Sequence, residues 1–168
     1  MFYYTFISDI GEITVIADEN YIKAVHFGKS EYVNKKTPLI SEAVNQLQEY
    51  FKGNRKVFTV PLKPDGTDFQ RKVWKALTEI PYGQTASYGE IAEKIGKSGG
   101  ARAVGNANNK NPIAIMIPCH RVIGANGSLT GYAAGLDIKK KLLDLEKFYC
   151  KTPVSYTHLR AHETELHL

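Results

Sequence analysis

Two adjacent residues, Cys119 and His120, could do nucleophilic chemistry, because a thiol can attack an electrophile while an imidazole takes its proton. An apolar run over residues 113–117 and then Pro118 precede them, which predicts a buried strand ending at the thiol. Adjacent residues on a regular strand face opposite ways. A cooperating pair therefore needs irregular backbone, which Pro118 is placed to impose. The alternative is a structural thiol, since free cysteines are commonly small buried hydrophobes.

The composition indicates a globular protein with a preference for polyanions. The 168 residues are 43% hydrophobic, which suits one ordinary domain or two small ones. The net charge is +5 and the pI is about 9.1, which favours a polyanionic partner, although many soluble proteins are mildly basic. No apolar run reaches membrane-spanning length, so we expect a soluble cytoplasmic protein with no membrane partner. The two cysteines, Cys119 and Cys150, provide no disulfide framework.

The last residues differ in character from the rest. Residues 155–168 have no helical or strand periodicity and resemble a translated sequencing-adapter fragment, so we expect a non-native tail. Three of the five histidines, at positions 158, 162 and 167, lie in it. Only His26 and His120 remain, so a histidine-cluster metal site loses most of its support and we expect no such metal site. His26 lies in a predicted strand and is interpreted as structural.

Residues 1–63 predict a small domain of strands and one helix, with a boundary at Pro64-Asp65-Gly66. Three short β-rich runs separated by turn residues predict an antiparallel meander. A helix should begin after Thr37, where Pro38 suits the first turn. The predicted elements are strands at residues 2–7, 13–17, 22–27 and 57–62 and a helix at residues 38–52.

Residues 64–154 predict a mainly helical second domain. Two short helices, at residues 84–96 and 101–110, flank a glycine-bearing turn, which is the helix-turn-helix signal. Asn126-Gly127 predicts a hairpin turn. Glu146 lies beside the apolar stripe of a final helix, where it could face Cys119 or be a solvated glutamate. The three other predictions are a helix from Thr67 or Asp68 to Glu79, the final helix at residues 137–148 and a buried stripe of Ile138, Leu142, Leu145 and Tyr149 on that helix.

The second helix of this pair carries mostly small side chains. A helix that reads bases needs several long polar side chains, and here only Arg102 is long. Small residues instead predict close approach to a narrow groove, with Arg102 contacting or entering the base stack. The alternative is that they pack against the preceding helix while Arg102 is solvated. The face proposed to meet DNA consists of Ala101, Val104, Gly105, Ala107 and Asn108.

The segment from Ile117 to Val122, I-P-C-H-R-V, resembles the active-site motif of the O6-alkylguanine-DNA alkyltransferases, also called methylated-DNA–protein-cysteine methyltransferases. The similarity spans about residues 64–150. It implies an α+β fold in which an N-terminal ribonuclease-H-like domain precedes a C-terminal helical domain with a helix-turn-helix. Further matching segments in family order are Gly66–Gln70, Val73–Trp74, Ile80–Gly83, Ser87–Tyr88, Ala101–Val104, Asn111–Pro112, Gly131–Tyr132 and Leu142–Glu146.

The resemblance implies a single-turnover DNA repair protein that acts as a monomer on double-stranded DNA and needs no cofactor. Cys119 would accept the alkyl group from O6 of guanine, His120 would act as base through a water, and Glu146 would orient the imidazole. The thioether product is irreversible. Activity on O4-alkylthymine is a second reaction to test. Ala133 and Ala134 replace smaller or hydroxylated residues that some members carry beside the pocket, and they bear on the size of the alkyl group.

The resemblance also implies that the target guanine is flipped out of the duplex through the minor groove. The implied roles are phosphate rotation by Tyr88, filling of the stack by Arg102, donation to the guanine by Tyr132 and bridging of the helix-turn-helix to the active-site segment by Asn111. Three other functions fit the sequence less well. A damage sensor of the alkyltransferase-like type lacks the cysteine, a cysteine hydrolase needs an oxyanion hole, and a sequence-specific regulator needs a base-reading helix.

Overall fold

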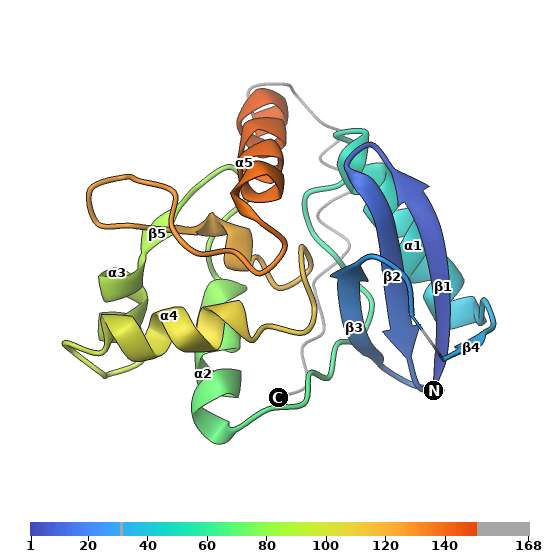
Figure 1. Cartoon of the computed structure of the whole chain (residues 1–168), viewed down its shortest axis with the longest axis horizontal. Helices are drawn as coiled ribbons and strands as arrows, with labels where there is room; N and C mark the ends of the chain where they lie inside the picture. The colour runs from blue at the N-terminus through green and yellow to red at the C-terminus, as the bar shows by residue number, and fades with distance from the viewer. Residues whose placement is uncertain (31, 151–168) are drawn as a thin grey trace.

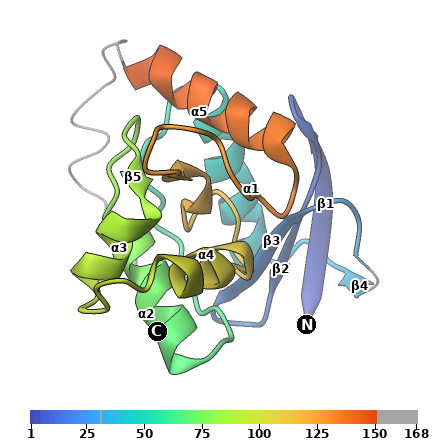
Figure 2. The ribbon, with the colours of Figure 1, turned by 60° about the vertical axis from the view of Figure 1, so that its left-hand side comes forward.

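The computed structural model describes residues 1–30 and 32–150, and of residue 33 only the backbone. The suspected tail at residues 155–168 lies outside the described residues. Figure 1 shows an α+β molecule with a sheet and helix α1 on one side and helices α2, α3 and α4 on the other. Helix α5 lies above both parts, as Figure 2 shows from a second direction. The predicted α+β fold class is confirmed.

The N-terminal sheet is built on an antiparallel meander, as predicted. Its strand order is β3-β2-β1-β4, and the two-residue β4 lies parallel to β1. The strand β4 was not predicted, because two residues carry no readable periodicity. Helix α1 packs against the sheet and begins as predicted, with Thr37 accepting a hydrogen bond from the Ile40 amide and Pro38 in the first turn. The elements are β1 (Phe2–Ser8), β2 (Gly11–Ala17), β3 (Ile22–Phe27), β4 (Val33–Asn34) and α1 (Pro38–Phe51).

The predicted strand at residues 57–62 is wrong. Only Leu62 forms a bridge, with Ile22 of β3, and the Ile22 amide donates to the Pro61 carbonyl over 2.9 Å. Phe58, Val60 and Leu62 are nevertheless buried. Their alternation reflects side chains that fill the core from an extended segment, while Pro61 lacks the amide that a regular ladder requires.

The C-terminal part consists mainly of four helices. Helix α2 begins after Thr67, which forms a capping box with Gln70. Trp74 of α2 is buried and donates its indole N–H to the Ala107 carbonyl over 2.8 Å, which ties α2 to α4. The helices are α2 (Asp68–Leu77), α3 (Tyr88–Lys94), α4 (Ala101–Asn109) and α5 (Leu136–Cys150).

Helix α3 starts four residues later than predicted, because Ser87 and Glu90 form a capping box that begins it at Tyr88. The preceding residues form strand β5 (Ala86–Ser87), which pairs in parallel with β6 (Val122–Ile123). The predicted hairpin around Asn126-Gly127 is therefore wrong. The turn itself is present, with the Gly124 amide donating to the Ser128 carbonyl. The strand that pairs with β6, however, is β5, which precedes α3, and not a strand that follows the turn.

The predicted strand at residues 113–117 is a buried turn. Only Ile113 makes a bridge, with Val25 of β3, and Ile115 adopts a φ of 70°, which is strained for a β-branched residue. An apolar run indicates burial and does not by itself distinguish a strand from a packed turn. The irregular backbone expected after Pro118 is confirmed, because Cys119–Arg121 form a 3₁₀ turn, η1. In the described part of the chain, no helix is long and apolar enough to cross a membrane.

Candidate active site

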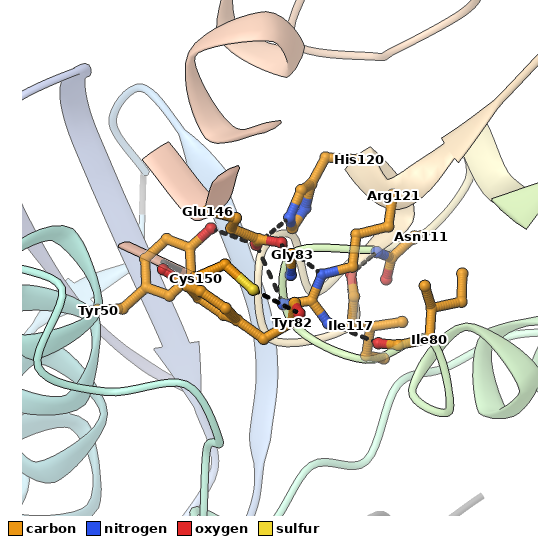
Figure 3. A network of polar contacts seen from close by, with 10 residues as sticks. All are labelled: Tyr50, Ile80, Tyr82, Gly83, Asn111, Ile117, His120, Arg121, Glu146 and Cys150. Carbon is orange, nitrogen blue, oxygen red and sulfur yellow. Dashed lines mark hydrogen bonds and ion pairs between the residues drawn. The ribbon is translucent and has the colours of Figure 1, made fainter. Parts of the chain in front are cut away.

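The 3₁₀ turn η1 places Cys119, His120 and Arg121 all in the interior. Their exposed fractions are 6%, 0% and 6%. A regular strand would have turned His120 away from its neighbours on each side. The tighter turn therefore allows the thiol and the imidazole to belong to one buried site. Figure 3 shows the polar contacts of His120 and Arg121 in it from close by, without Cys119.

Glu146 of α5 is the centre of this network and is only 1% exposed, so the solvated alternative is wrong. Its Oε2 accepts a hydrogen bond from His120 Nε2 over 2.6 Å. Arg121 binds both carboxylate oxygens, with Nε to Oε1 at 2.8 Å and Nη2 to Oε2 at 3.0 Å, and the Gly83 amide donates to Oε1. Burial acts to raise the pKa of Glu146, but His120 and Arg121 hold it well below its usual range. The carboxylate is therefore ionised.

The hydrogen bond to Glu146 determines which nitrogen of His120 carries the proton. An ionised carboxylate can only accept, so Nε2 donates and Nδ1 has a free lone pair in the neutral ring. Nδ1 is buried and has no hydrogen-bond partner among the described residues. Burial lowers the pKa of His120, against the opposing effect of Glu146. The imidazole is thus a neutral base with its accepting nitrogen available.

Sequence reasoning missed two parts of this network. Tyr50 of α1 donates its hydroxyl to Glu146 Oε2 over 2.6 Å, and Arg121 donates from Nη1 to the Ile80 carbonyl over 2.8 Å. Tyr50 fits the apolar stripe of α1, where it looks like an ordinary core aromatic. The adjacency of Arg121 to the Cys–His pair was the one available signal for its role.

Three side chains affect the ionisation of Cys119. Burial raises the pKa of the thiol, while Asn111, Lys139 and Tyr132 act to lower it. Lys139 is fully buried, and its Nζ donates to the carbonyls of Val122, Thr130 and Gly131 over 2.5, 2.8 and 3.3 Å. Burial lowers the pKa of Lys139 to about 8. Near neutral pH it therefore supplies positive charge that favours a thiolate at Cys119.

Lys139 was absent from the predicted site because α5 is rotated relative to the predicted stripe. The residues of α5 that are buried are Lys139, Leu142 and Glu146, whereas Ile138 and Leu145 are half-buried. A lysine four residues after Gly135 looks like a surface residue in the sequence. Here three backbone carbonyls replace the water that its ammonium group would otherwise bind.

Cys119 lies in the wall of a pocket of about 350 Å³. Its walls come from both parts of the molecule, because β3 lines one side. The Tyr132 hydroxyl is buried there without a hydrogen-bond partner among the described residues, and burial next to Cys119 raises its pKa. His26 lines the pocket too, beyond the structural role predicted for it. The lining residues are Ala24–Phe27, Asn108, Asn109, Asn111, Pro112, Ala114, Cys119 and Tyr132–Ala134.

Helix α4 presents a different face from the one predicted. Val104, Ala107 and Asn108 are buried, and Asn108 Nδ2 donates to the Cys119 carbonyl over 3.3 Å. The placement of Asn108 on a DNA-facing surface is therefore corrected, because its side chain supports the active-site backbone. The free face runs through Arg102, half-buried Gly105, Asn106 and Asn109, with half-buried Ala101 at its start. Arg102 is exposed and makes no hydrogen bond or ion pair with the described residues.

Tyr88 and Asn111 connect α3 and α4 to the pocket. The Tyr88 hydroxyl donates to the Thr130 carbonyl over 2.9 Å. Asn111 Nδ2 donates to the carbonyls of Ile117 and Ile113 over 2.8 and 3.3 Å, while its Oδ1 accepts from the Ile113 amide. Asn111 thus fixes the turn before Cys119 to the end of α4. Within residues 1–30 and 32–150, no group of three or more His, Cys, Asp or Glu side chains is placed to hold a metal ion.

Comparisons with known proteins match both parts of the chain. Residues 1–64 match the ribonuclease-like domain of 6-O-methylguanine DNA methyltransferase, and residues 68–148 match its DNA binding domain. The chain is 54% identical over 154 residues to methylated-DNA–protein-cysteine methyltransferase of Methanosarcina acetivorans, covering 87% of this chain and 98% of that protein. It is 50% identical over 151 residues to the protein of the same name from Mycobacterium tuberculosis, covering 86% and 92%.

Solved structures agree with these sequence matches. OGT of Mycobacterium tuberculosis in complex with DNA superimposes with a TM-score of 0.83 at 48% identity, over 89% of this chain and 94% of that one. The O6-methylguanine-DNA methyltransferase of Pyrococcus kodakaraensis, at 22% identity and a TM-score of 0.57, shares the fold. Together with the buried Cys119–His120–Glu146 arrangement, these matches show that the chain belongs to the 6-O-methylguanine DNA methyltransferase family.

Proposed function

We propose that this protein repairs DNA by moving an alkyl group from O6 of guanine to Sγ of its own Cys119, once per molecule. The observation that carries the proposal is the pairing of His120 with Glu146 through Nε2, which leaves a buried Nδ1 free on the residue that follows Cys119 in the chain. The membership in a family with relatives named methylated-DNA–protein-cysteine methyltransferase supports the same reaction.

In the proposed reaction, His120 Nδ1 accepts the Cys119 proton through a water, and Glu146 stabilises the imidazolium that forms. Sγ attacks the alkyl carbon, so an S–C bond forms while the C–O6 bond breaks. The electron pair of that bond stays on the guanine, which takes a proton and leaves as ordinary guanine. Lys139 favours the thiolate electrostatically, and Tyr132 is a protonated hydroxyl that can donate to the departing base.

We further propose that the lesion reaches Cys119 by flipping out of double-stranded DNA through the minor groove. The pocket of about 350 Å³ lies within the size range of sites for small molecules. Arg102, on the free face of α4, would fill the vacated stack, and Tyr88 would move the phosphate. Ala101 and Gly105 would allow α4 to approach the DNA closely. The polar contacts to DNA that were predicted for Asn108 would instead come from Asn106 and Asn109, which are exposed. We place the protein in the cytoplasm as a monomer.

Intact-mass spectrometry tests the transfer directly. After incubation with excess duplex carrying O6-methylguanine, the wild-type protein should gain the mass of one methyl group. Cys119→Ser should bind the same duplex without any gain. Cys150→Ser is the matched control, because Cys150 is a free, exposed cysteine, and this variant should gain mass like the wild type. An unmodified wild-type protein, or a gain that persists in Cys119→Ser, would refute the proposed acceptor. A separate incubation with a duplex carrying O4-methylthymine measures whether the protein also accepts the methyl group from that lesion.

A further inference from the structure

We propose that Tyr50, in the N-terminal part of the chain, is a positioning residue of the alkyl-transfer site. Its hydroxyl shares Glu146 Oε2 with His120, and thereby controls how strongly the carboxylate stabilises the charged imidazole. The inference rests on the proposed function, because it concerns the groups that activate Cys119. It assigns to the N-terminal part a chemical role at the site.

The geometry places two donors on one oxygen. Tyr50 Oη and His120 Nε2 each lie 2.6 Å from Glu146 Oε2, although Tyr50 and Glu146 are 96 residues apart in the chain. Tyr50 is fully buried, and its ring packs against those of Phe58 and Tyr82 with centroid distances of 5.6 and 6.1 Å. Figure 3 shows the Tyr50 hydroxyl and the His120 ring converging on this carboxylate. Packing from both parts of the molecule therefore aims the hydroxyl.

In the hydrogen bond between Tyr50 and Glu146, the tyrosine hydroxyl is always the donor and the carboxylate always the acceptor. Burial and the neighbouring Glu146 raise the pKa of Tyr50 well above its usual value, so the hydroxyl stays protonated and donates. Each donor on a carboxylate oxygen draws on the same negative charge. Without the Tyr50 hydroxyl, more of that charge would act on His120 Nε2–H. The imidazolium would become more stable, and the pKa of His120 would rise from its burial-lowered value.

The other charged groups around His120 determine the pH range in which the shift of its pKa can be measured. Glu146 and Lys139 face it from α5, Cys119 and Arg121 flank it in η1, and Tyr50 faces the network from α1. Arg121 and Lys139 are cations that favour the neutral ring. Because the pKa of Lys139 is about 8, its charge is lost above that pH. The titration of His120 should therefore be measured on the acid side of pH 8.

The test compares pH profiles of the single-turnover rate constant, followed by intact mass. Tyr50→Phe removes the hydroxyl and keeps the ring. Its acid limb should move to higher pH by about one unit, so that transfer on that limb is about tenfold slower than in the wild type, while the plateau changes little. Tyr82→Phe is the matched control. It removes a buried hydroxyl with no hydrogen-bond partner among the described residues, so its acid limb should coincide with that of the wild type.

A second variant reverses the sign and retains the contact. Replacing Tyr50 with 3-fluorotyrosine makes the hydroxyl a stronger donor, so the acid limb should move to lower pH. This variant decides the matter if Tyr50→Phe does not fold. Acid limbs that stay in place in both variants would overturn the positioning role. So would a uniform slowing at every pH accompanied by a lower melting temperature, because that is the result of lost packing alone.

Failure of the proposed function would be recognised separately. If the wild-type protein gains no methyl group, alkyl transfer is refuted. The role of Tyr50 is then read from the imidazole resonances of His120, titrated by NMR in wild type and Tyr50→Phe. A higher pKa of His120 in the variant supports the inference, and an unchanged pKa overturns it.

Discussion

Glu146 is the residue on which the other groups of the site converge. Its two oxygens accept hydrogen bonds from Tyr50, His120, Arg121 and the Gly83 amide. A buried carboxylate is costly to desolvate, and it is tolerated only when its partners are complete. Removing its charge would leave the Arg121 guanidinium buried without a counter-ion. The residue should therefore contribute to stability as well as to chemistry.

We expect Glu146→Gln to lower the free energy of unfolding by about 3–5 kcal/mol at neutral pH, since it breaks a buried ion pair. The pKa of Glu146 is depressed in the folded state, so the unfolded chain takes up a proton first as the pH falls. The contribution of Glu146 is thus complete above the usual glutamate pKa of about 4.3 and is lost progressively as the pH falls from there toward the lower folded-state pKa. Urea unfolding of both proteins from pH 7 to pH 3 measures this as a shrinking difference.

Asp144→Asn is the control for this measurement. Asp144 lies on the same helix and pairs with Lys140 at the exposed surface, so its removal should leave the unfolding midpoint nearly unchanged. A difference between wild type and Glu146→Gln that stays constant down to pH 3 would show that the Glu146 charge is not what stabilises the fold.

Some residues of the site could be predicted from the sequence and others could not, depending on whether the residue type has a common structural explanation at its position. Cys119 and His120 could be proposed from their residue types and adjacency, and the role of Glu146 followed from the resemblance to the alkyltransferase family. Tyr50 and Lys139 could not. A tyrosine on an apolar stripe and a lysine in a helix have common structural explanations, and only the folded geometry brings them to the site.

Helix α4 shows what the sequence determines at the scale of an element. Its existence and length were predicted closely, since Ala101–Asn109 form it. Its orientation was left with two alternatives, and the structure agrees with the second, in which the small residues Val104 and Ala107 pack inward and Arg102 is exposed. The buried Trp74–Ala107 hydrogen bond and the Asn108 contact to Cys119 settle which side faces inward. The prediction for residues 113–117 was similar. The apolar run correctly indicated a buried segment, but tertiary contacts shape its backbone as a turn and not as a strand.

Arg102 on the free face of α4 should matter only for DNA. We expect Arg102→Ala to slow transfer from duplex O6-methylguanine by at least about tenfold, because unstacking a base costs a few kcal/mol that an inserted side chain offsets. The reaction with free O6-benzylguanine should be nearly unchanged. Single-turnover rates on the two substrates measure the contrast. Lys52→Ala, which removes an exposed cation at the end of α1, is the charge-matched control. Equal losses on both substrates would refute an intercalating role.

At the scale of the whole molecule, the two parts are joined by backbone as well as side chains. The Val25 amide of β3 donates to the Pro112 carbonyl, and the Ala114 amide donates back to the Val25 carbonyl, each over 3.0 Å. The Tyr50–Glu146 hydrogen bond joins α1 to α5. A pattern of separate helices and strands cannot predict this joint, because its partners are distant in sequence. Both parts should therefore depend on each other for stability.

We expect the two parts to unfold in one transition. Trp74, the single tryptophan, lies in the C-terminal part, so its fluorescence follows that part alone, whereas far-UV circular dichroism follows the sheet and all helices. Urea transitions recorded by the two probes should coincide, with the same midpoint and slope. A fluorescence midpoint separated from the dichroism midpoint would show that the parts unfold independently.

The position of Glu146 near the end of α5 has a consequence for biosynthesis. Glu146 follows His120 by 26 residues, so a ribosome finishes Cys119 and His120 well before it adds the carboxylate. Until α5 is complete and docked, the imidazole lacks its counter-ion and the thiol is an ordinary cysteine, weakly ionised at cellular pH. We therefore expect Cys119 to be less reactive toward electrophiles in the nascent chain than in the folded protein.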